Sequence, residues 1–347
     1  AGPEPFQEAR MYTSLMRSSA RFAIASYFGV LAGAGTGLAA QTPVEAVTAA
    51  GGAVQRARAF MLEGQRDSAT ELLGRHLSQQ PSDGRAWFYL GSIYLGEAQR
   101  WHRAGHPPGT SSASLLDFAS TSFEPAQELL TDSGGVFRVV VAIERATLRI
   151  EKSGWDSVAT RTLPADEVPL PPVLVELGQN LIASCPRNGV LVTGSLAETV
   201  AVWGIRLQGE RGDLLLLRPD MYQWDPRYRA RMAKAIGADS VAELPAALAA
   251  AARAHPICLA PAVDSINGPG LEWHAHRLVL TTAPPPTGFV PPLSVFRFAR
   301  TGLTGSVWTS SARDVYDLAA RRNHALCSTL FVSTDALIPP AIPACSR

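Results

Sequence analysis

The sequence predicts a protein of the α + α/β class, in which a module of helices precedes an open three-layer α/β domain. Two apolar runs, residues 189–193 and 213–217, have the length of buried strands. Between them, apolar side chains recur at spacings of three and four, as on one face of a helix: Leu196, Val200, Trp203 and Leu207. Strand, helix and strand in this order predict the βαβ unit of a parallel sheet.

Composition places the chain among globular proteins. Its 347 residues are 46% hydrophobic and 18% charged, with a formal net charge of +1, and this length suggests two domains. The charges are interspersed and form no basic stripe. We therefore expect neither a nucleic acid nor an anionic membrane as a partner.

The segment at residues 11–41 has the order of parts found in a secretory signal peptide. Arg17 and Arg21 precede a short apolar run, and small residues follow it up to Ala40. We expect residues 1–40 to be an N-terminal extension and a signal peptide cleaved near Ala40, which makes the mature chain periplasmic or secreted. The alternative is a retained membrane anchor, but the apolar core has about ten residues where a spanning helix needs about 20. No later stretch is apolar enough to span a bilayer.

All four cysteines lie in the C-terminal half of the chain: Cys185, Cys258, Cys327 and Cys345. An even count in an exported protein favours disulfides, and four cysteines permit three pairings. We favour Cys327 with Cys345, which ties down the C-terminal extension, and Cys185 with Cys258, at two positions that flank strands. Buried free thiols are the alternative.

The region 43–150 carries an internal repeat. A 34-residue offset aligns three pairs of positions: Ala53 with Trp87, Ala57 with Gly91, and Phe60 with Tyr94. Four residues of one stretch resemble the first helix of a tetratricopeptide repeat: Trp87, Leu90, Gly91 and Tyr94. Ala69 lies where that family has a small residue in its second helix. The resemblance implies helical hairpins with a protein-binding groove, marked here by the repeat-signature residues Ala57, Phe60, Ala69, Trp87, Leu90, Gly91 and Tyr94.

The repeat register is lost after Ala104, where turn-forming residues make an insertion. A helix is expected to resume at Leu115, and Ala119, Phe123 and Ala126 fit a displaced second helix of the second repeat. A further helix is predicted over residues 137–150.

His102 and His106 have the spacing of two metal ligands on one helix face. Gly105 and Pro107 interrupt the helix there, however, and no carboxylate stands at ligand spacing. We interpret both histidines as solvated loop residues and expect no metal and no cofactor.

A proline-rich linker at residues 151–172 separates the helices from the α/β domain, which is expected to cover residues 173–347 with a proline-rich C-terminal extension. Further helices are predicted over 173–184, 227–236, 241–254 and 311–323. Asp225 caps the second of these, and Asp239 or Ser240 caps the third. Further strands are predicted over 256–260, 272–282 and 293–298, with an edge strand at 327–332.

A pattern of strand, turn, helix and strand carries four marked positions: Gly194, Trp203, Arg211 and Asp213. It resembles the soluble periplasmic α/β domain of bacterial membrane proteins related to protein O-mannosyltransferases, over residues 171–282 at most. The resemblance implies a Rossmann-like fold. The sequence has no counterpart of the membrane part, where glycosyl transfer resides, and its turn is less polar than that family's, so catalysis is not implied.

Thr193, Gly194 and Ser195 join the carboxyl end of a predicted strand to the start of a helix. Backbone amides and the helix dipole at such a turn favour an anion such as phosphate, which makes these residues a weak ligand-site candidate. No glycine-rich phosphate motif is present, so we prefer to interpret Ser195 as a helix cap.

A nucleophilic catalytic set could be assembled only from Ser195, Asp264, His274 and His276. The GxSxG motif is absent, and the two histidines lie on one side of a predicted strand. We expect structural or surface roles for them and assign no catalytic residue.

These observations favour an exported, non-enzymatic interaction or scaffold protein that binds a protein partner in the cell envelope through the helical module. A membrane complex is one such partner. The alternative is an envelope enzyme or accessory factor that acts on glycans or lipid-linked sugars and uses the α/β domain.

Overall fold

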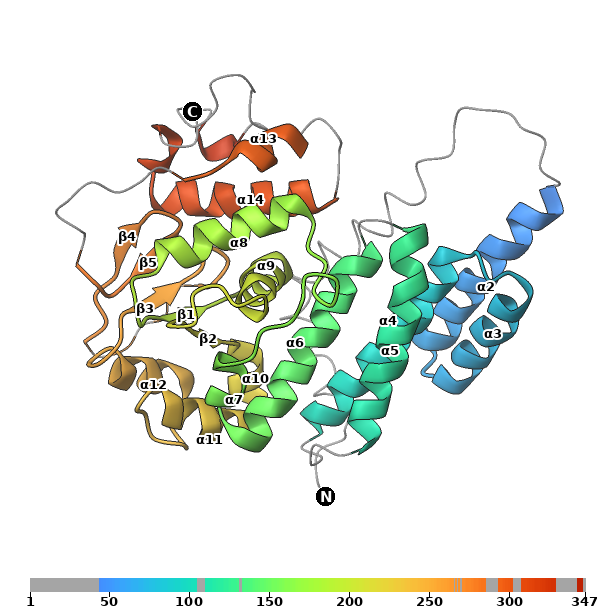
Figure 1. The fold of residues 1–347 in the computed structure, drawn as a ribbon, viewed down its shortest axis with the longest axis horizontal. Helices are drawn as coiled ribbons and strands as arrows, with labels where there is room; N and C mark the ends of the chain where they lie inside the picture. Colours follow the sequence, from blue (N-terminus) through green and yellow to red (C-terminus); the bar gives the residue numbers. More distant parts are fainter. Residues whose placement is uncertain are drawn as a thin grey trace.

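The structure is a computed structural model, and it describes residues 44–104, 110–130, 133–264, 266, 268, 270–284, 293–301, 307–328 and 342–345. The expected signal peptide, its cleavage position near Ala40, and His106 lie outside these residues. The described part of the chain is mostly helical and contains a small five-stranded mixed sheet, an arrangement compatible with the α + α/β class (Figure 1).

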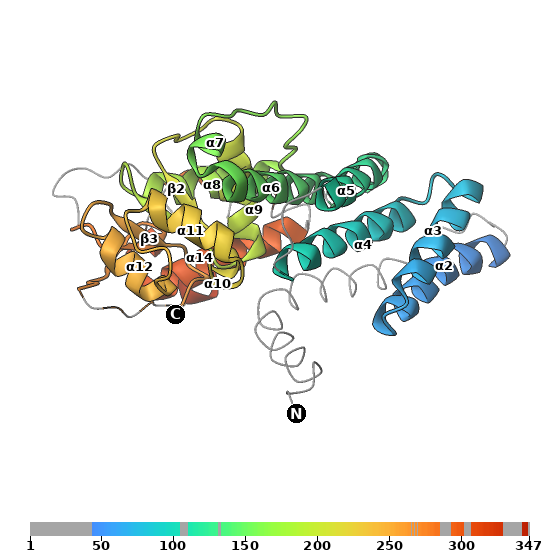
Figure 2. The ribbon, with the colours of Figure 1, turned by 90° about the horizontal axis from the view of Figure 1, so that it is seen from below.

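The N-terminal helices pack as successive hairpins. Helices α2 (Val44–Leu62) and α3 (Arg66–Gln79) form the first, and α4 (Gly84–Arg103) and α5 (Thr110–Leu129) form the second. Helix α6 (Ser133–Ser153) packs against both α4 and α5. Helices α2 and α3 lie farthest from the sheet (Figure 2). The second helix of the second hairpin begins earlier than the predicted Leu115, and α6 extends the predicted helix at both ends.

Small residues allow these helices to approach one another. A core between α2, α3 and α4 consists of Ala57, Ala69, Leu73, Leu77, Ala86, Leu90 and Ile93. On α4, a Cβ atom at Gly91 would lie 2.8 Å from the ring of Phe123 on α5. Any side chain at position 91 would therefore push the two helices of the second hairpin apart.

The sheet has the strand order β2-β1-β3-β5-β4. Its strands are β1 (Val190–Val192), β2 (Leu215–Leu217), β3 (Ile257–Leu259), β4 (His274–His276) and β5 (Val279–Thr281). The first strand pairs in parallel with both β2 and β3, and β3, β5 and β4 pair in antiparallel fashion. The predicted βαβ unit is confirmed, with α9 (Leu196–Leu207) as its crossover helix. The single strand predicted over 272–282 is instead a hairpin, which turns at Arg277 with a φ of 50°.

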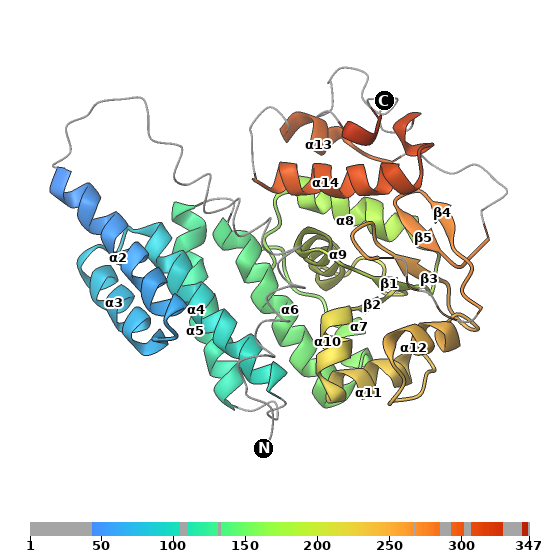
Figure 3. The same ribbon diagram turned by 180° about the vertical axis from the view of Figure 1, so that it is seen from behind.

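Helices cover both sides of the sheet. Helices α8 (Pro172–Ser184), α9 and α14 (Val307–Arg322) lie on one side, and α10 (Pro219–Trp224), α11 (Pro226–Ala235) and α12 (Leu244–Ala251) lie on the other (Figures 1 and 3). Two short helices complete this part of the chain: α13 (Phe296–Thr301), against α8 and α14, and the 3₁₀ turn η1 (Pro343–Cys345), against α14.

Three local predictions in this domain were wrong. Residues of the strand predicted over 293–298 enter α13, because the buried carboxylate of Glu176 accepts hydrogen bonds from the amides of Arg297 and Phe298 at 2.8 Å. Helix α12 starts at Leu244 rather than directly after Asp239, which instead accepts a hydrogen bond from the amide of Val241. Residues 327–328, at the start of the predicted edge strand, are helical, and the rest of that strand lies outside the described residues.

The second hairpin, α6 and the sheet share one continuous core. Helix α6 contacts both α9 and α11. Just after α6, Trp155 packs edge-on against the buried Trp203 of α9, with ring centroids 5.9 Å apart. The proline-rich stretch also packs on α9, where the amide of Leu163 donates to the carbonyl of Leu207 at 2.7 Å. Several residues expected in the linker, among them Trp155, Leu163 and Val168, thus belong to the packed interior.

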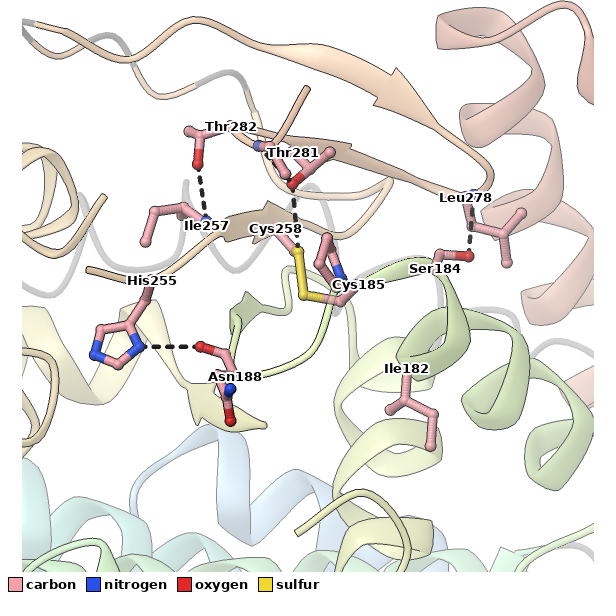
Figure 4. Close-up of a disulfide and its surroundings, with 12 residues drawn as sticks. Ile182, Ser184, Cys185, Asn188, His255, Ile257, Cys258, Leu278, Thr281 and Thr282 are labelled. Carbon is pink, nitrogen blue, oxygen red and sulfur yellow. Dashed lines mark hydrogen bonds between the residues drawn. A yellow bond between two sulfur atoms is a disulfide. The ribbon is translucent and has the colours of Figure 1, made fainter. Parts of the chain in front are cut away.

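Both favoured disulfide pairings are present. Cys185, at the end of α8, is bonded to Cys258 on β3, and Cys327 is bonded to Cys345 in η1. The first bond lies beneath the β5 strand, where the sulfur of Cys258 also faces the hydroxyl of Thr281 (Figure 4). Disulfides form in oxidising compartments, so this pattern fits an extracellular or periplasmic protein. No helix in the described ranges is both long and apolar enough to cross a bilayer.

Candidate functional site

The repeat-signature residues mostly form packing between helices. Ala57 and Ala69 are fully buried, Leu90 and Gly91 are buried, and Phe60, Trp87 and Tyr94 are half-buried against the same cores. The indole nitrogen of Trp87 donates to the carbonyl of Pro81 at 2.8 Å. The ring of Tyr94 lies 5.3 Å from that of Phe118 on α5. These side chains mainly hold the hairpins together.

One face of α4 is partly open along its whole length. The residues Tyr89, Ser92, Gly96, Gln99 and Arg103 recur every three or four positions, and each is half-buried. We refer to these five residues as the α4 face. Helix α2 contacts α4. Burial raises the pKa of Tyr89, and the charge of Arg58 on α2 opposes that rise. The α4 face is thus continuous with α2 at one end.

The predicted anion turn after β1 is filled by a side chain of the chain itself. The amides of Gly194 and Ser195 donate to Oε2 of Glu198 at 2.9 and 3.0 Å. The amide of Ala262 donates to Oε1 of the same carboxylate at 2.7 Å. Ser195 completes a capping box, because its hydroxyl accepts from the amide of Glu198. Ser195 is therefore the helix cap that the sequence favoured.

Glu198 leaves little opportunity for an external anion at this turn. Its side chain is fully buried, and burial raises its pKa while the three amide hydrogen bonds oppose that rise. A Cβ atom at Gly194 would lie 2.6 Å from the backbone of Ala262, so only glycine permits this close approach. Thr193 faces inward and shares a hydrogen bond with Thr199. An external phosphate would have to displace Glu198 before it could reach the two amides.

The structure does not bring the four residues of the tentative catalytic set together. Ser195 follows β1, whereas His274 and His276 lie on β4, three strand spacings away, or about 14 Å. Burial, together with Arg277, lowers the pKa of His276. Asp264 is exposed in the loop that follows β3.

A largely buried cluster of charged and polar residues, of which Asp220 is partly exposed, lies where the helical hairpins meet the carboxyl end of β2. Its members come from α4, α6, the end of β2, α10 and α11, and we refer to them as the charge cluster: His102, Glu144, Thr147, Glu151, Arg218, Asp220, Asp225 and Tyr228. The described residues contain no group of three metal-ligating side chains able to hold an ion, here or elsewhere.

Arg218 occupies the centre of the charge cluster. It follows β2 directly, is only 8% exposed, and donates to Glu144 (3.1 Å) and Thr147 (3.2 Å) of α6. It also forms an ion pair with Asp220 at 2.9 Å. Burial alone would lower the pKa of Arg218, but Asp220 and Glu144 hold it above its ordinary value. A single cation therefore joins the helical hairpins to the edge of the sheet.

His102 has a different position from the one predicted. It is 2% exposed, and its Nδ1 atom lies 3.9 Å from Oε2 of Glu144. Burial lowers the pKa of His102, against the opposing charges of Glu144 and Asp225. Among the described residues, neither ring nitrogen has a hydrogen-bond partner, and nor does Oε2 of Glu144. The expected solvated loop histidine is instead an imidazole beside a buried carboxylate, because α4 continues through Arg103 and carries it under α6.

Glu151 and Asp225 form the second half of the cluster. Burial raises the pKa of Glu151 to about 8, and the neighbouring Asp225 adds to the rise through its charge and a hydrogen bond. Asp225 also caps α11, accepting from the amides of Arg227 (2.7 Å) and Tyr228 (3.1 Å). By contrast, Arg218 lowers the pKa of Asp220 although burial opposes it. The cluster thus contains one carboxyl group with a raised pKa, Glu151, and one with a lowered pKa, Asp220, and opposite shifts of this kind occur at many functional sites.

The sequence offered only weak signals for this cluster. Arg218 directly follows a predicted strand, and the carboxyl ends of strands are common ligand positions in α/β domains. Its partners on α4 and α6 are more than 70 residues away in the sequence, so no local pattern connects them.

Comparisons with family models, with curated proteins and with solved structures found no match for this chain.

Proposed function

We propose that this chain is an exported, non-enzymatic interaction protein that binds a protein partner of the cell envelope along the α4 face. In this proposal the helical hairpins are tetratricopeptide-like repeats, and the C-terminal part is a Rossmann-like scaffold. A signal peptide cleaved near Ala40 would bring the chain to the compartment in which its disulfides form.

The main support for the proposal is the close packing of Gly91 on α4 against Phe123 on α5. Ala119, Phe123 and Ala126, the expected inward residues of a displaced second helix, are all fully buried on α5. Helices α2, α4 and α6 are then the successive first helices, and they contact one another in that order. In tetratricopeptide proteins the first helices line the concave, partner-binding surface. The half-buried α4 face is the part of α4 that could serve this role.

Site-specific photocrosslinking in the envelope tests the proposal. A photoreactive residue at Ser92 should crosslink one partner, whereas the same residue at Ser78 on α3 should not. Both are helical serines whose hydroxyl donates to the carbonyl four residues earlier, that of Phe88 or of Gly74, and Ser78 is the more exposed of the two. Identical crosslinks from both positions, or none from Ser92, would contradict binding along the α4 face.

A second candidate function is an envelope enzyme or accessory factor for glycans or lipid-linked sugars. One observation favours it: at the carboxyl end of β2, the un-hydrogen-bonded imidazole of His102 lies in the same cluster as the high-pKa carboxyl of Glu151. Trp101 and Trp224, next in sequence to two members of the cluster, are 37% and 43% exposed, and indole rings stack well on sugars. A thermal shift with a phosphorylated sugar that is lost in His102→Ala would support this function, and no shift in the wild type would exclude that ligand.

A further inference from the structure

The two disulfides have very different surroundings. Cys185 and Cys258 are 2% and 0% exposed and lie inside the α/β core (Figure 4). Cys327 and Cys345 are both half-buried and lie at the molecular surface, beyond the end of α14. An attacking thiolate can approach the second pair in the folded protein, whereas the first pair is shielded by β5 and α8.

A histidine stands beside the exposed disulfide. The Nδ1 atom of His324 is 3.7 Å from the sulfur of Cys327, and His324 itself is exposed. A surface hollow lined by Ala320, Arg321, His324 and Ala344 opens at the same place. An imidazole hydrogen or positive charge next to a sulfur stabilises the thiolate form, which makes that sulfur a better leaving group.

The fold around this disulfide does not depend on the covalent bond alone. The amide of Ala344 donates to Oδ1 of Asp317 at 2.7 Å, and Oδ2 of the same carboxylate pairs with Arg321. Ile342 is 2% exposed and belongs to the main core. These contacts do not involve the sulfur–sulfur bond, so opening the ring closed by two cysteines 18 positions apart requires no global unfolding.

We propose that the Cys327–Cys345 disulfide is a thiol–disulfide exchange site, reducible in the folded protein by an external dithiol, with His324 positioned to stabilise the departing thiolate. The thiolate of the dithiol attacks the sulfur of Cys345 and forms a mixed disulfide. The electron pair of the broken bond passes to the sulfur of Cys327, next to His324. The second thiol of the reagent, after losing its proton to solvent, then attacks the mixed disulfide. Cys345 leaves as a thiolate, and the reagent becomes a disulfide.

Differential alkylation of the oxidised full chain tests the proposal directly. The protein is exposed to dithiothreitol or to glutathione, quenched in acid, alkylated and digested with trypsin. Cys327 and Cys345 fall in one tryptic peptide, residues 323–347, whereas Cys185 and Cys258 fall in two, so the pairs are scored separately. Under both reagents the exposed pair should be reduced about tenfold faster or more, while circular dichroism stays native. The dithiol should carry the reaction to completion, whereas the monothiol should leave a mixed disulfide.

Two variants isolate the role of His324. His324→Gln should slow reduction of the exposed pair severalfold and leave the buried pair unchanged, whereas His324→Lys, which restores a cation, should keep the wild-type rate. The exchange site would be refuted if both pairs were reduced at one rate that matches global unfolding. Equal rates in the wild type and His324→Gln would refute the role of His324.

Discussion

Replacing Arg218 with methionine tests whether the charge cluster holds the helical hairpins to the sheet. Methionine fills much of the same volume but leaves the carboxylate of Glu144, which is 2% exposed, without its cation. Removing one partner of a buried ion pair costs about 3–5 kcal/mol. The free energy of unfolding of Arg218→Met, measured by urea denaturation, should therefore fall by that amount.

A second substitution separates the free-energy cost of the uncompensated charge from the cost of lost packing. Adding Glu144→Gln to Arg218→Met removes the buried charge and should recover about 2 kcal/mol or more. The control is Arg75→Met, which breaks an exposed pair with Glu71, both side chains being 70% exposed, and should cost less than about 0.5 kcal/mol. A loss below about 1 kcal/mol for Arg218→Met, or a double variant no more stable than the single one, would show that Arg218 does not compensate a buried charge on Glu144.

Three further predictions concern stability. Gly194→Ala should lower the free energy of unfolding by about 1–3 kcal/mol in urea, because its Cβ meets the backbone of Ala262, and an unchanged midpoint would contradict that contact. Ser195→Ala should cost about 1 kcal/mol through loss of the helix cap, visible as a lower Tm, and an unaltered Tm would argue against the capping box. The pKa of Glu151 in the folded chain, about 8, exceeds its reference value of 4.5. The stability that the protonated Glu151 contributes to the fold is therefore complete below about pH 4.5 and is lost as the pH rises to about 8. The stability of the wild type relative to Glu151→Gln should fall by up to about 1.4 kcal/mol per pH unit in that window, and parallel curves would contradict the raised pKa.

Local signals in the sequence predicted most of what local chemistry determines. Apolar spacing placed α9 within the βαβ unit, and Asp225 and Ser195 both cap the helices expected to follow them. The disulfide pairings were also correct: Cys185 and Cys258 were paired as positions that flank strands, and Cys327 and Cys345 as the pair that ties down the C-terminal extension. The helix of residues 172–184 and the strand around Cys258 follow from the same patterns.

Contacts between segments distant in the sequence determined the structural features that the sequence did not predict. In the sequence, Glu198 looks like an ordinary residue of a helix's first turn. It accepts hydrogen bonds from three amides only because Ala262 approaches it from the loop after β3. Residues 293–298 have the composition of a strand, but the buried Glu176 on α8 stabilises the first turn of a helix there. His102 became buried because α6 covers the end of α4, a contact between segments about 40 residues apart.

The affinity of the captured partner for purified variants shows directly whether the partner binds along the α4 face. Ser92→Arg places a long charged side chain on the α4 face, and Ser78→Arg places the same side chain on α3. Both proteins should keep the wild-type Tm, which establishes that they are folded. We expect Ser92→Arg to weaken binding about tenfold or more in calorimetry, whereas Ser78→Arg should bind like the wild type. Wild-type affinity in Ser92→Arg would contradict binding along the α4 face.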